Sequence, residues 1–200
     1  KNAKTLDQAQ INKLDLICKK LQLKKGEKIL ELGGGWGYFA KYAAENYDCE
    51  VTTYNISEEQ VKYARELCKG LKVNIVHKDY REANGVFDKV ASIGLREHIG
   101  YKNYRSFMEL AHRCLKNNGL FLMHTIGGNK SVTYTDPWIN KYIFPNSMLP
   151  SVRQLSEAIE GLFVMEDWHN FGAHYDKTLL EWYKNFEKNW PKFKEQYGEK

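Results

Sequence analysis

The sequence contains no long apolar run, no closely spaced pair of cysteines and no proline before residue 137. No apolar stretch approaches the roughly 18 residues of a membrane-spanning helix, and the charged N-terminus does not have the pattern of a signal peptide, so we expect neither segment. The four cysteines form no Cys-x-x-Cys pair and have no paired histidines nearby, which argues against a zinc site and a disulfide framework. We therefore expect no metal, reduced thiols, and a cytoplasmic protein that at most touches a membrane face.

Charge also lacks a strong bias, because 30 basic and 25 acidic residues are interspersed and give a net charge of +5. A solvated surface of mixed charge explains this pattern at least as well as a nucleic-acid groove does, so we predict no nucleic-acid partner. A modest attraction to anionic lipid remains open. With 200 residues and 42% hydrophobic content, the chain can form one domain with a core, and it is too short for two comfortable ones.

The position of the prolines marks a change in the chain. All four lie at or after residue 137, so the character of the sequence changes at about residue 127. We expect a single domain over residues 1–200, in which about 127–150 form an irregular insertion on the substrate side. Within it, Asp136-Pro137-Trp138-Ile139 is typical of a short helix. The aromatic side chains of the insertion either line a pocket or pack on the core.

A glycine-rich turn at 33–37 is the feature around which the rest is arranged. The residues before it form a short apolar run that ends in an acid, and the residues after it have helical spacing, which predicts a strand, a tight turn and a helix. Glycine lets the backbone adopt positive φ and approach a ligand closely, and the unpaired N–H groups of the helix point to the same place. A tight turn without a ligand is the alternative. The spacing Glu-x-Gly-x-Gly-x-Gly differs from the dinucleotide fingerprint and is similar to the first motif of S-adenosylmethionine-dependent methyltransferases.

Strands and helices alternate along the first 160 residues, which predicts right-handed β-α-β units and a parallel α/β sheet. We expect strands at about 27–32, 49–54, 73–76, 87–93, 119–126 and 163–168, and helices at about 5–21, 38–46, 57–68, 101–115 and 151–160. A later helical face carries Leu179, Trp182, Tyr183, Phe186 and Trp190, which we interpret as a core stripe.

Ligands of an open parallel sheet bind beyond the carboxyl ends of the strands, and several polar residues are expected there. Asn55 can hydrogen-bond a ribose, and Asp79 with Tyr80 can hydrogen-bond and stack on an adenine, although each is also typical of a loop cap. Glu97 and His124 end adjacent strands, so they form either a structural ion pair or a proton-handling site, of which we favour the second. His98 should point away from Glu97 and have a structural role.

Seven ordered runs of residues are spread along the chain. They are Leu-Gly-Gly-Gly-Trp-Gly at 32–37, Ile-Ser-Glu-Glu-Gln at 56–60, Asp-Tyr-Arg at 79–81, Glu-His-Ile-Gly at 97–100, Leu-Met-His-Thr-Ile-Gly at 122–127, Asp-Pro-Trp-Ile-Asn-Lys-Tyr-Ile-Phe-Pro at 136–145 and Asp-Trp-His-Asn at 167–170. Together they resemble the cyclopropane-fatty-acyl-phospholipid synthases, and the resemblance covers essentially the whole chain. Such ordered runs are far more specific than the glycine turn, which by itself supports only a methyltransferase.

The resemblance implies a Rossmann-like class I methyltransferase fold, with a doubly wound, mostly parallel sheet in the strand order 3-2-1-4-5. It also implies an enzyme that adds the methyl carbon of S-adenosylmethionine across a cis double bond of a phospholipid acyl chain, forming a cyclopropane ring. It implies lipid at the inner membrane face as the partner and allows a homodimer of the full-length protein. The implied cofactor residues are Gly33, Gly35, Gly37, Asn55, Gln60, Asp79, Tyr80 and Ile93. A bicarbonate ion, held by groups matching Glu97, His124, the Ile126 backbone and Tyr175, is the implied base.

Three differences from the family pattern bear on activity. The family usually has Cys at the position of Gly34, and we expect this change to be harmless because that side chain does not face the ligand. It commonly has Phe at the position of Arg96, so a cation beside Glu97 alters the local electrostatics. Relatives also carry more chain at both ends, including an upstream cysteine. A same-fold enzyme that makes a simple methylated product, and a non-catalytic module that binds cofactor, are the alternatives.

Overall fold

A computed structural model describes residues 3–198 of the protein. The chain divides into two compact units, one of residues 14–164 and the other of residues up to 13 together with 165 onward. Whether the whole chain acts as a single domain stays a prediction. No helix in the part of the chain that the structure describes has the length and apolar character needed to cross a membrane.

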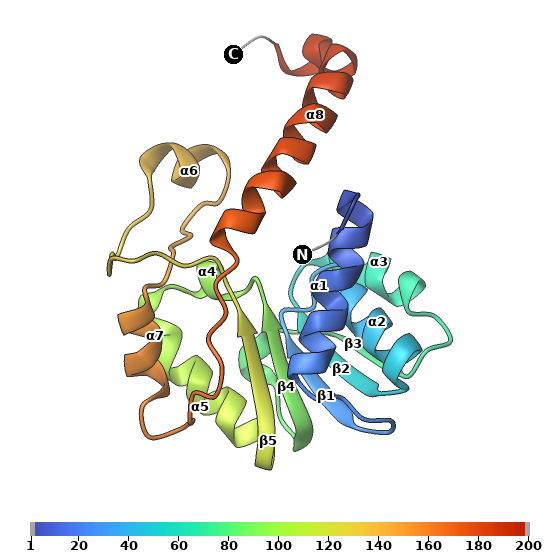
Figure 1. The fold of residues 1–200 in the computed structure, drawn as a ribbon, viewed down its shortest axis with the longest axis vertical. Coiled ribbons are helices and arrows are strands. Elements are labelled where there is room, and N and C mark those ends of the chain that lie inside the picture. The colour runs from blue at the N-terminus through green and yellow to red at the C-terminus, as the bar shows by residue number, and fades with distance from the viewer. Residues whose placement is uncertain (1–2, 199–200) are drawn as a thin grey trace. The chain divides into compact units, whose positions relative to one another are not determined.

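A five-stranded parallel sheet forms the centre of the larger unit, in the order β3-β2-β1-β4-β5 (Figure 1). This confirms the predicted doubly wound topology, with its crossover between β1 and β4. The strands are β1 Lys28–Leu32, β2 Glu50–Asn55, β3 Val73–His77, β4 Phe87–Ile93 and β5 Leu115–His124.

Helices cover both faces of the sheet because successive side chains of a buried strand point to opposite faces. In β4, Val90 packs in a cluster with α5, whereas Ala91 packs in a cluster with α2 and the C-terminal half of α1. The helices are α1 Leu6–Lys20, α2 Tyr38–Tyr47, α3 Glu58–Leu67, α4 Arg96–Ile99, α5 Tyr104–Cys114, α6 Pro137–Tyr142, α7 Val152–Ile159 and α8 Gly172–Tyr197, with 3-10 turns η1 Tyr80–Glu82 and η2 Tyr101–Asn103.

Local caps explain why several helices begin where the sequence predicts. The Ser57 hydroxyl accepts the Gln60 N–H at 3.5 Å at the start of α3. Ser151 and Gln154 form a reciprocal capping box at the start of α7. Asp136 caps the short helix α6 of the insertion, since its carboxylate accepts two backbone N–H groups at 2.9 and 3.1 Å. These caps satisfy donors that have no partner within the helix.

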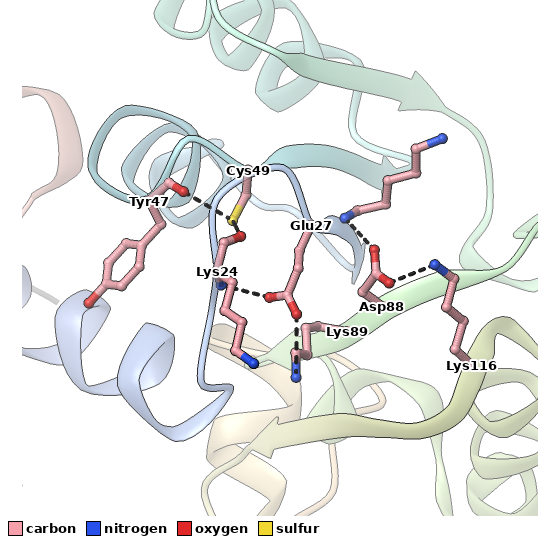
Figure 2. Close-up of polar contacts among 8 residues, drawn as sticks. Lys24, Glu27, Tyr47, Cys49, Asp88, Lys89 and Lys116 are labelled. Atoms are coloured by element: carbon pink, nitrogen blue, oxygen red, sulfur yellow. Dashed lines mark hydrogen bonds and ion pairs between the residues drawn. The ribbon is translucent and has the colours of Figure 1, made fainter.

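The amino edge of the sheet is closed by paired charges (Figure 2). The Glu27 carboxylate lies 3.7 Å from Lys89 Nζ, and both side chains are largely buried. Asp88 accepts the Lys28 backbone N–H at 2.8 Å and pairs with Lys116 Nζ at 2.6 Å. Each of these two carboxylates has a cationic partner, so both serve to hold neighbouring strands together at this edge.

The predicted sixth strand at 163–168 is wrong, because those residues are irregular and the sheet ends at β5. A strand needs a neighbouring strand to receive its backbone hydrogen bonds, and none of the described residues supplies one here. Phe163 instead packs on Phe121, with ring centroids 5.4 Å apart. Phe163 therefore attaches this stretch to the core, whereas Val164, Met165 and Trp168 are exposed.

The interpretation of the later apolar stripe as core is also wrong. Its residues lie on α8, as the helical period predicts, but none of the described residues of α8 is buried. The aromatic rings contact one another along the helix, as Phe186 and Trp190 do with centroids 5.2 Å apart. Periodicity identified the helix, whereas burial depends on what packs against it.

Candidate active site

The glycine turn leaves an open space directly beyond β1. The backbone N–H groups of Gly33 and Gly34 both donate to the Tyr54 carbonyl oxygen at 3.1 Å, which holds the turn against β2. Gly35 has a φ of +50°, and a Cβ built on it would have no protein atom within 4 Å. The turn therefore presents bare backbone to empty space, which is the arrangement a closely approaching ligand needs.

Two neighbouring glycines are required for packing instead. A Cβ on Gly37 would lie 2.8 Å from the Ala64 Cβ, so this glycine allows α2 and α3 to approach. A Cβ on Gly34 would lie 1.9 Å from Thr53 Oγ1. A Cys at position 34, which the resemblance implies for the family, would collide with the Thr53 side chain as it stands in this chain, whereas Gly34 fits beside it. That the change from Cys to Gly is harmless stays a prediction.

We predict that Gly34→Cys lowers the free energy of unfolding by about 1–3 kcal/mol, as overpacking typically does. Adding Thr53→Ala removes the colliding hydroxyl and should recover most of that loss. Urea denaturation of the two single variants and the double variant measures the coupling between the two positions. Equal losses from Gly34→Cys with and without Thr53→Ala would contradict this account.

Asn55 joins the glycine turn to the start of α3. Its Nδ2 group donates to the Gly35 carbonyl oxygen and to Gln60 Oε1, both at 2.9 Å, and its Oδ1 accepts the Ser57 N–H at 2.9 Å. The amide is therefore engaged within the protein and fixes the shape of the turn. Direct hydrogen bonding of Asn55 or Gln60 to a ribose stays a prediction.

Asp79 and Tyr80 follow β3 at the same edge of the sheet. Arg81 binds both carboxylate oxygens of Asp79, with Nε at 2.9 Å and Nη2 at 2.7 Å, and holds the pKa of that carboxyl below its usual range. Tyr80 is half-buried, and its ring meets that of Phe107 edge to face at 5.4 Å. Both residues are oriented by the protein, and their contact with an adenine stays a prediction.

Glu97 lies in α4, a short helix that the sequence analysis missed. Its Oε1 accepts the Ile126 backbone N–H at 2.7 Å, and its carbonyl oxygen accepts the Met148 N–H at 2.8 Å. Its Oε2 is buried, and no described group hydrogen-bonds it. One carboxylate oxygen is thus fixed while the other is available, which suits a group that holds a proton or a polar ligand.

The structure brings Glu97, Ile126, His124 and Ile93 to one place. Ile93 and His124 are paired residues at the ends of β4 and β5, and His124 lies two residues before Ile126. His98 is exposed and meets the Phe144 ring edge to face at 5.6 Å. Tyr175 belongs to the other compact unit, where its ring contacts Trp182, so its place among the catalytic residues stays a prediction.

Arg96 directs its guanidinium into the aromatic packing of α5, and the charge of the neighbouring Glu97 still acts on it. The side chain is fully buried, and its guanidinium carbon lies 4.1 Å from the ring centroid of Tyr104 and 4.8 Å from that of Phe107. Burial lowers the pKa of Arg96 to about 10, so it is charged at neutral pH. Aromatic faces stabilise this cation, which therefore acts mainly within the packing of α5.

Glu31, at the end of β1, is a site-edge residue that the analysis of the sequence did not assign. It is buried, and its Oε2 accepts no hydrogen bond from the described residues. Burial raises the pKa of Glu31 to about 7. Its position just before the glycine turn is a signal in the sequence from which Glu31 could have been predicted as a site residue.

The carboxyl edge thus differs from the amino edge in how its polar groups are satisfied. Buried polar groups normally have hydrogen-bond partners, and unpaired ones call for a ligand or water. Most of those that lack a protein partner within residues 3–198 belong to the carboxyl halves of strands or to the residues that follow them, namely Glu31, Thr53, Ser92, Arg96 and Glu97, whereas Tyr104 begins α5. This distribution marks the carboxyl edge as the candidate active site.

Comparison with known sequences agrees with this placement. Residues 1–200 match the family model described as Mycolic acid cyclopropane synthetase. The chain is 52% identical over 200 residues to the cyclopropane-fatty-acyl-phospholipid synthase of Escherichia coli (strain K12), covering all of this chain and 52% of that protein. It is 37% identical over 196 residues to a probable fatty acid methyltransferase of Pseudomonas putida, covering 92% of this chain and 50% of the relative. The chain spans about half the length of these relatives.

Solved structures of similar fold include two cyclopropane synthases. The cyclopropane synthase MmaA2 from Mycobacterium tuberculosis superimposes with a TM-score of 0.90 at 25% identity, covering 100% of this chain and 76% of the other. The mycolic acid cyclopropane synthase CmaA1, complexed with SAH and CTAB, superimposes with a TM-score of 0.87 at 28% identity, covering 98% and 75%. The predicted class I methyltransferase fold is therefore confirmed.

Proposed function

Because this chain belongs to the mycolic acid cyclopropane synthetase family, we propose that it forms the methyltransferase part of an enzyme that makes cyclopropane rings. The methyl carbon of S-adenosylmethionine is transferred to a cis double bond in an acyl chain of an unsaturated phospholipid. The identity to the E. coli synthase supports the phospholipid substrate. The observation that most supports this proposal is the state of the Glu97 carboxylate at the carboxyl edge of the sheet. Its Oε1 accepts the Ile126 backbone N–H, and its Oε2 is buried with no hydrogen-bond partner among the described residues.

The residues at the edge fit S-adenosylmethionine. The space over Gly35 would be filled by a Cβ, and Asn55 holds the turn in that shape. Asp79, oriented by Arg81, and Tyr80 stand where the adenosine would be held, with Gly33, Gln60 and Ile93 completing the set. When bound, the cofactor supplies an electrophilic methyl carbon.

The protein's contribution to the chemistry follows from the weakness of an alkene as a nucleophile. The residues must align the double bond, exclude water and manage one proton. Glu97, His124, Ile126 and Tyr175 are the groups we assign to proton handling, and the open Glu97 Oε2 would also hold a bicarbonate ion. Two anions in contact in a low-dielectric site repel, so Glu97 and the bicarbonate must share a proton between them.

We extend the proposal to location and assembly. A substrate embedded in a bilayer requires the protein to act at the membrane surface, so we place it peripherally at the inner, cytoplasmic face. The full-length protein is proposed to form a homodimer. Flotation with vesicles and light scattering of the full-length protein test these two statements separately.

Gly35→Ala tests the cofactor position. A Cβ at residue 35 would stand in the ligand space while touching no protein atom, so affinity for S-adenosylhomocysteine should fall by about tenfold or more, a loss of about 1.4 kcal/mol or more. Gly26→Ala is the matched control, because Gly26 also has a positive φ and open surroundings but precedes β1 at the opposite edge. Calorimetry that gives equal affinities for the two variants would refute the placement.

Product analysis separates the proposed reaction from its alternatives. We expect a cyclopropane resonance in acyl chains recovered from unsaturated phospholipid vesicles. A methyl-branched product without that resonance would identify simple methyl transfer, an activity that the similarity to a probable fatty acid methyltransferase makes worth testing. Cofactor binding without any product, even in a full-length protein, would identify a binding module.

A further inference from the structure

A cavity of about 390 Å³ lies between the turn after α4 and the insertion. Its lining residues are almost all neutral hydrogen-bonding residues, with one cation, Lys102, and no acid among the described residues. Such a lining favours an anion over a cation as the occupant. The lining includes Tyr101, Asn103, Thr133, Thr135, Asn140, Asn146 and Ser147.

The floor of this cavity is attached to the candidate active site. Ser147 and Met148 are buried there, and the Met148 N–H donates to the Glu97 carbonyl oxygen at 2.8 Å. Gly100, which ends α4, also lines the cavity. A molecule in the cavity would therefore lie one hydrogen-bonded step from the backbone of the residue assigned to catalysis.

Two features provide donors for an anion. The Ser147 hydroxyl has no hydrogen-bond partner among the described residues, although the residue is only 8% exposed. The second donor is the ammonium group of Lys102, which lines the same cavity. A lysine and a free hydroxyl together suit a phosphate group.

The surface beside the cavity suits a lipid more than a free ion. On α6, Trp138 and Tyr142 are 58% and 60% exposed, with ring centroids 5.8 Å apart, and Lys141 Nζ lies 4.9 Å from the Tyr142 ring centroid. The one acid of the helix region, Asp136, is occupied by capping α6. Exposed tryptophan, tyrosine and lysine are the residues that favour the interface between head groups and acyl chains.

We propose that this cavity binds the phosphate head group of the phospholipid whose acyl chain reaches Glu97, with α6 lying against the membrane surface. This inference rests on the proposed function and adds a second, polar recognition site for the same substrate. Lys102 neutralises the phosphate, and Ser147 donates a hydrogen bond to it. Head-group recognition then determines which phospholipids are modified.

The test measures binding of dihexanoyl-phosphatidylglycerol below its micelle concentration to this chain by calorimetry. Lys102→Met should weaken binding about five- to tenfold, and the effect should shrink at high salt because it is a charge effect. Ser147→Ala should weaken binding about threefold independently of salt. Lys141→Met is the matched control, since it removes the same charge from α6, outside the cavity, and should change this affinity less than twofold.

Equal effects of Lys102→Met and Lys141→Met would overturn the proposal, because they would indicate a general surface charge. So would inorganic phosphate that displaces the lipid at equal concentration, because it would indicate a free-anion site. Binding of S-adenosylhomocysteine and cyclopropane formation are measured in parallel. If the head group binds through Lys102 but no cyclopropane forms, this inference stands and the proposed function fails. If cyclopropane forms but the head group does not bind through Lys102, the proposed function stands and this inference fails.

Discussion

Glu97→Gln is expected to lower turnover by about 10²-fold or more, the usual consequence of losing a positioned group that handles a proton, equivalent to about 2.7 kcal/mol in the barrier. Glutamine keeps an acceptor for the Ile126 N–H, now 2.7 Å from Glu97 Oε1, so the shape of the site is retained. It places an NH₂ group where the buried Oε2 now lies, and an amide can neither take nor share the proton. Affinity for S-adenosylhomocysteine should stay unchanged.

Glu109→Gln provides the comparison, because Glu109 is an exposed acid on α5 paired with Arg105 and far less constrained. It should turn over at the parent rate. Turnover of the parent should also rise with added bicarbonate, whereas that of Glu97→Gln should not. A Glu97→Gln protein with the parent rate on unsaturated phospholipid vesicles would show that Glu97 only connects α4 to the Ile126 and Met148 backbone.

Glu31 is expected to make stability depend on pH near neutrality. Its pKa is raised from 4.5 to about 7 in the folded protein, so the folded state keeps the proton that the unfolded state has already released. The stabilisation is complete below the unfolded pKa and is lost as pH rises through about 7. The difference between the two pKa values corresponds to about 3 kcal/mol, an order-of-magnitude figure.

Urea denaturation of Glu31→Gln and the parent between pH 4.5 and 8.5, a range of roughly four units around the two values, measures this effect. The parent should lose stability relative to Glu31→Gln as pH rises, because glutamine has no proton to release. Asp88→Asn should differ from the parent by a constant amount across this range, since Lys116 lowers the pKa of Asp88 below its ordinary 3.8 and that stabilisation is lost only in more acidic solution. A constant difference between Glu31→Gln and the parent across the range would mean that Glu31 ionises freely.

A large part of the fold could be predicted from the sequence because its signals are local. Alternating buried strands and capped helices set the order of elements, and residues such as Ser57 and Asp136 mark helix starts through bonds to their nearest neighbours. The same reasoning placed Asn55, Asp79, Glu97 and His124 at one edge, because the carboxyl ends of parallel strands coincide. The glycine turn was recognised from its spacing.

Features that depend on residues distant in sequence were not accessible in this way. The short helix α4 has no N-terminal capping side chain from which its start could have been predicted. The expected strand at 163–168 does not form because a strand needs a neighbouring strand to pair with. The apolar face of α8 was interpreted as core because the helical period of apolar residues does not show what packs against a helix. The direction of the Arg96 side chain, toward Tyr104 and Phe107, followed from packing with α5.

By itself, the sequence determined the α/β architecture and the edge at which we place the chemistry, because hydrophobic period, capping and turn chemistry act between near neighbours. The strand order was implied by the family resemblance. Tertiary structure decided which atoms at that edge are free. Thr53 fills the space beside Gly34, Ile126 occupies one oxygen of Glu97, and burial raises the pKa of Glu31. Each of these depends on the distance and solvent exclusion between residues that the chain brings together only when it folds.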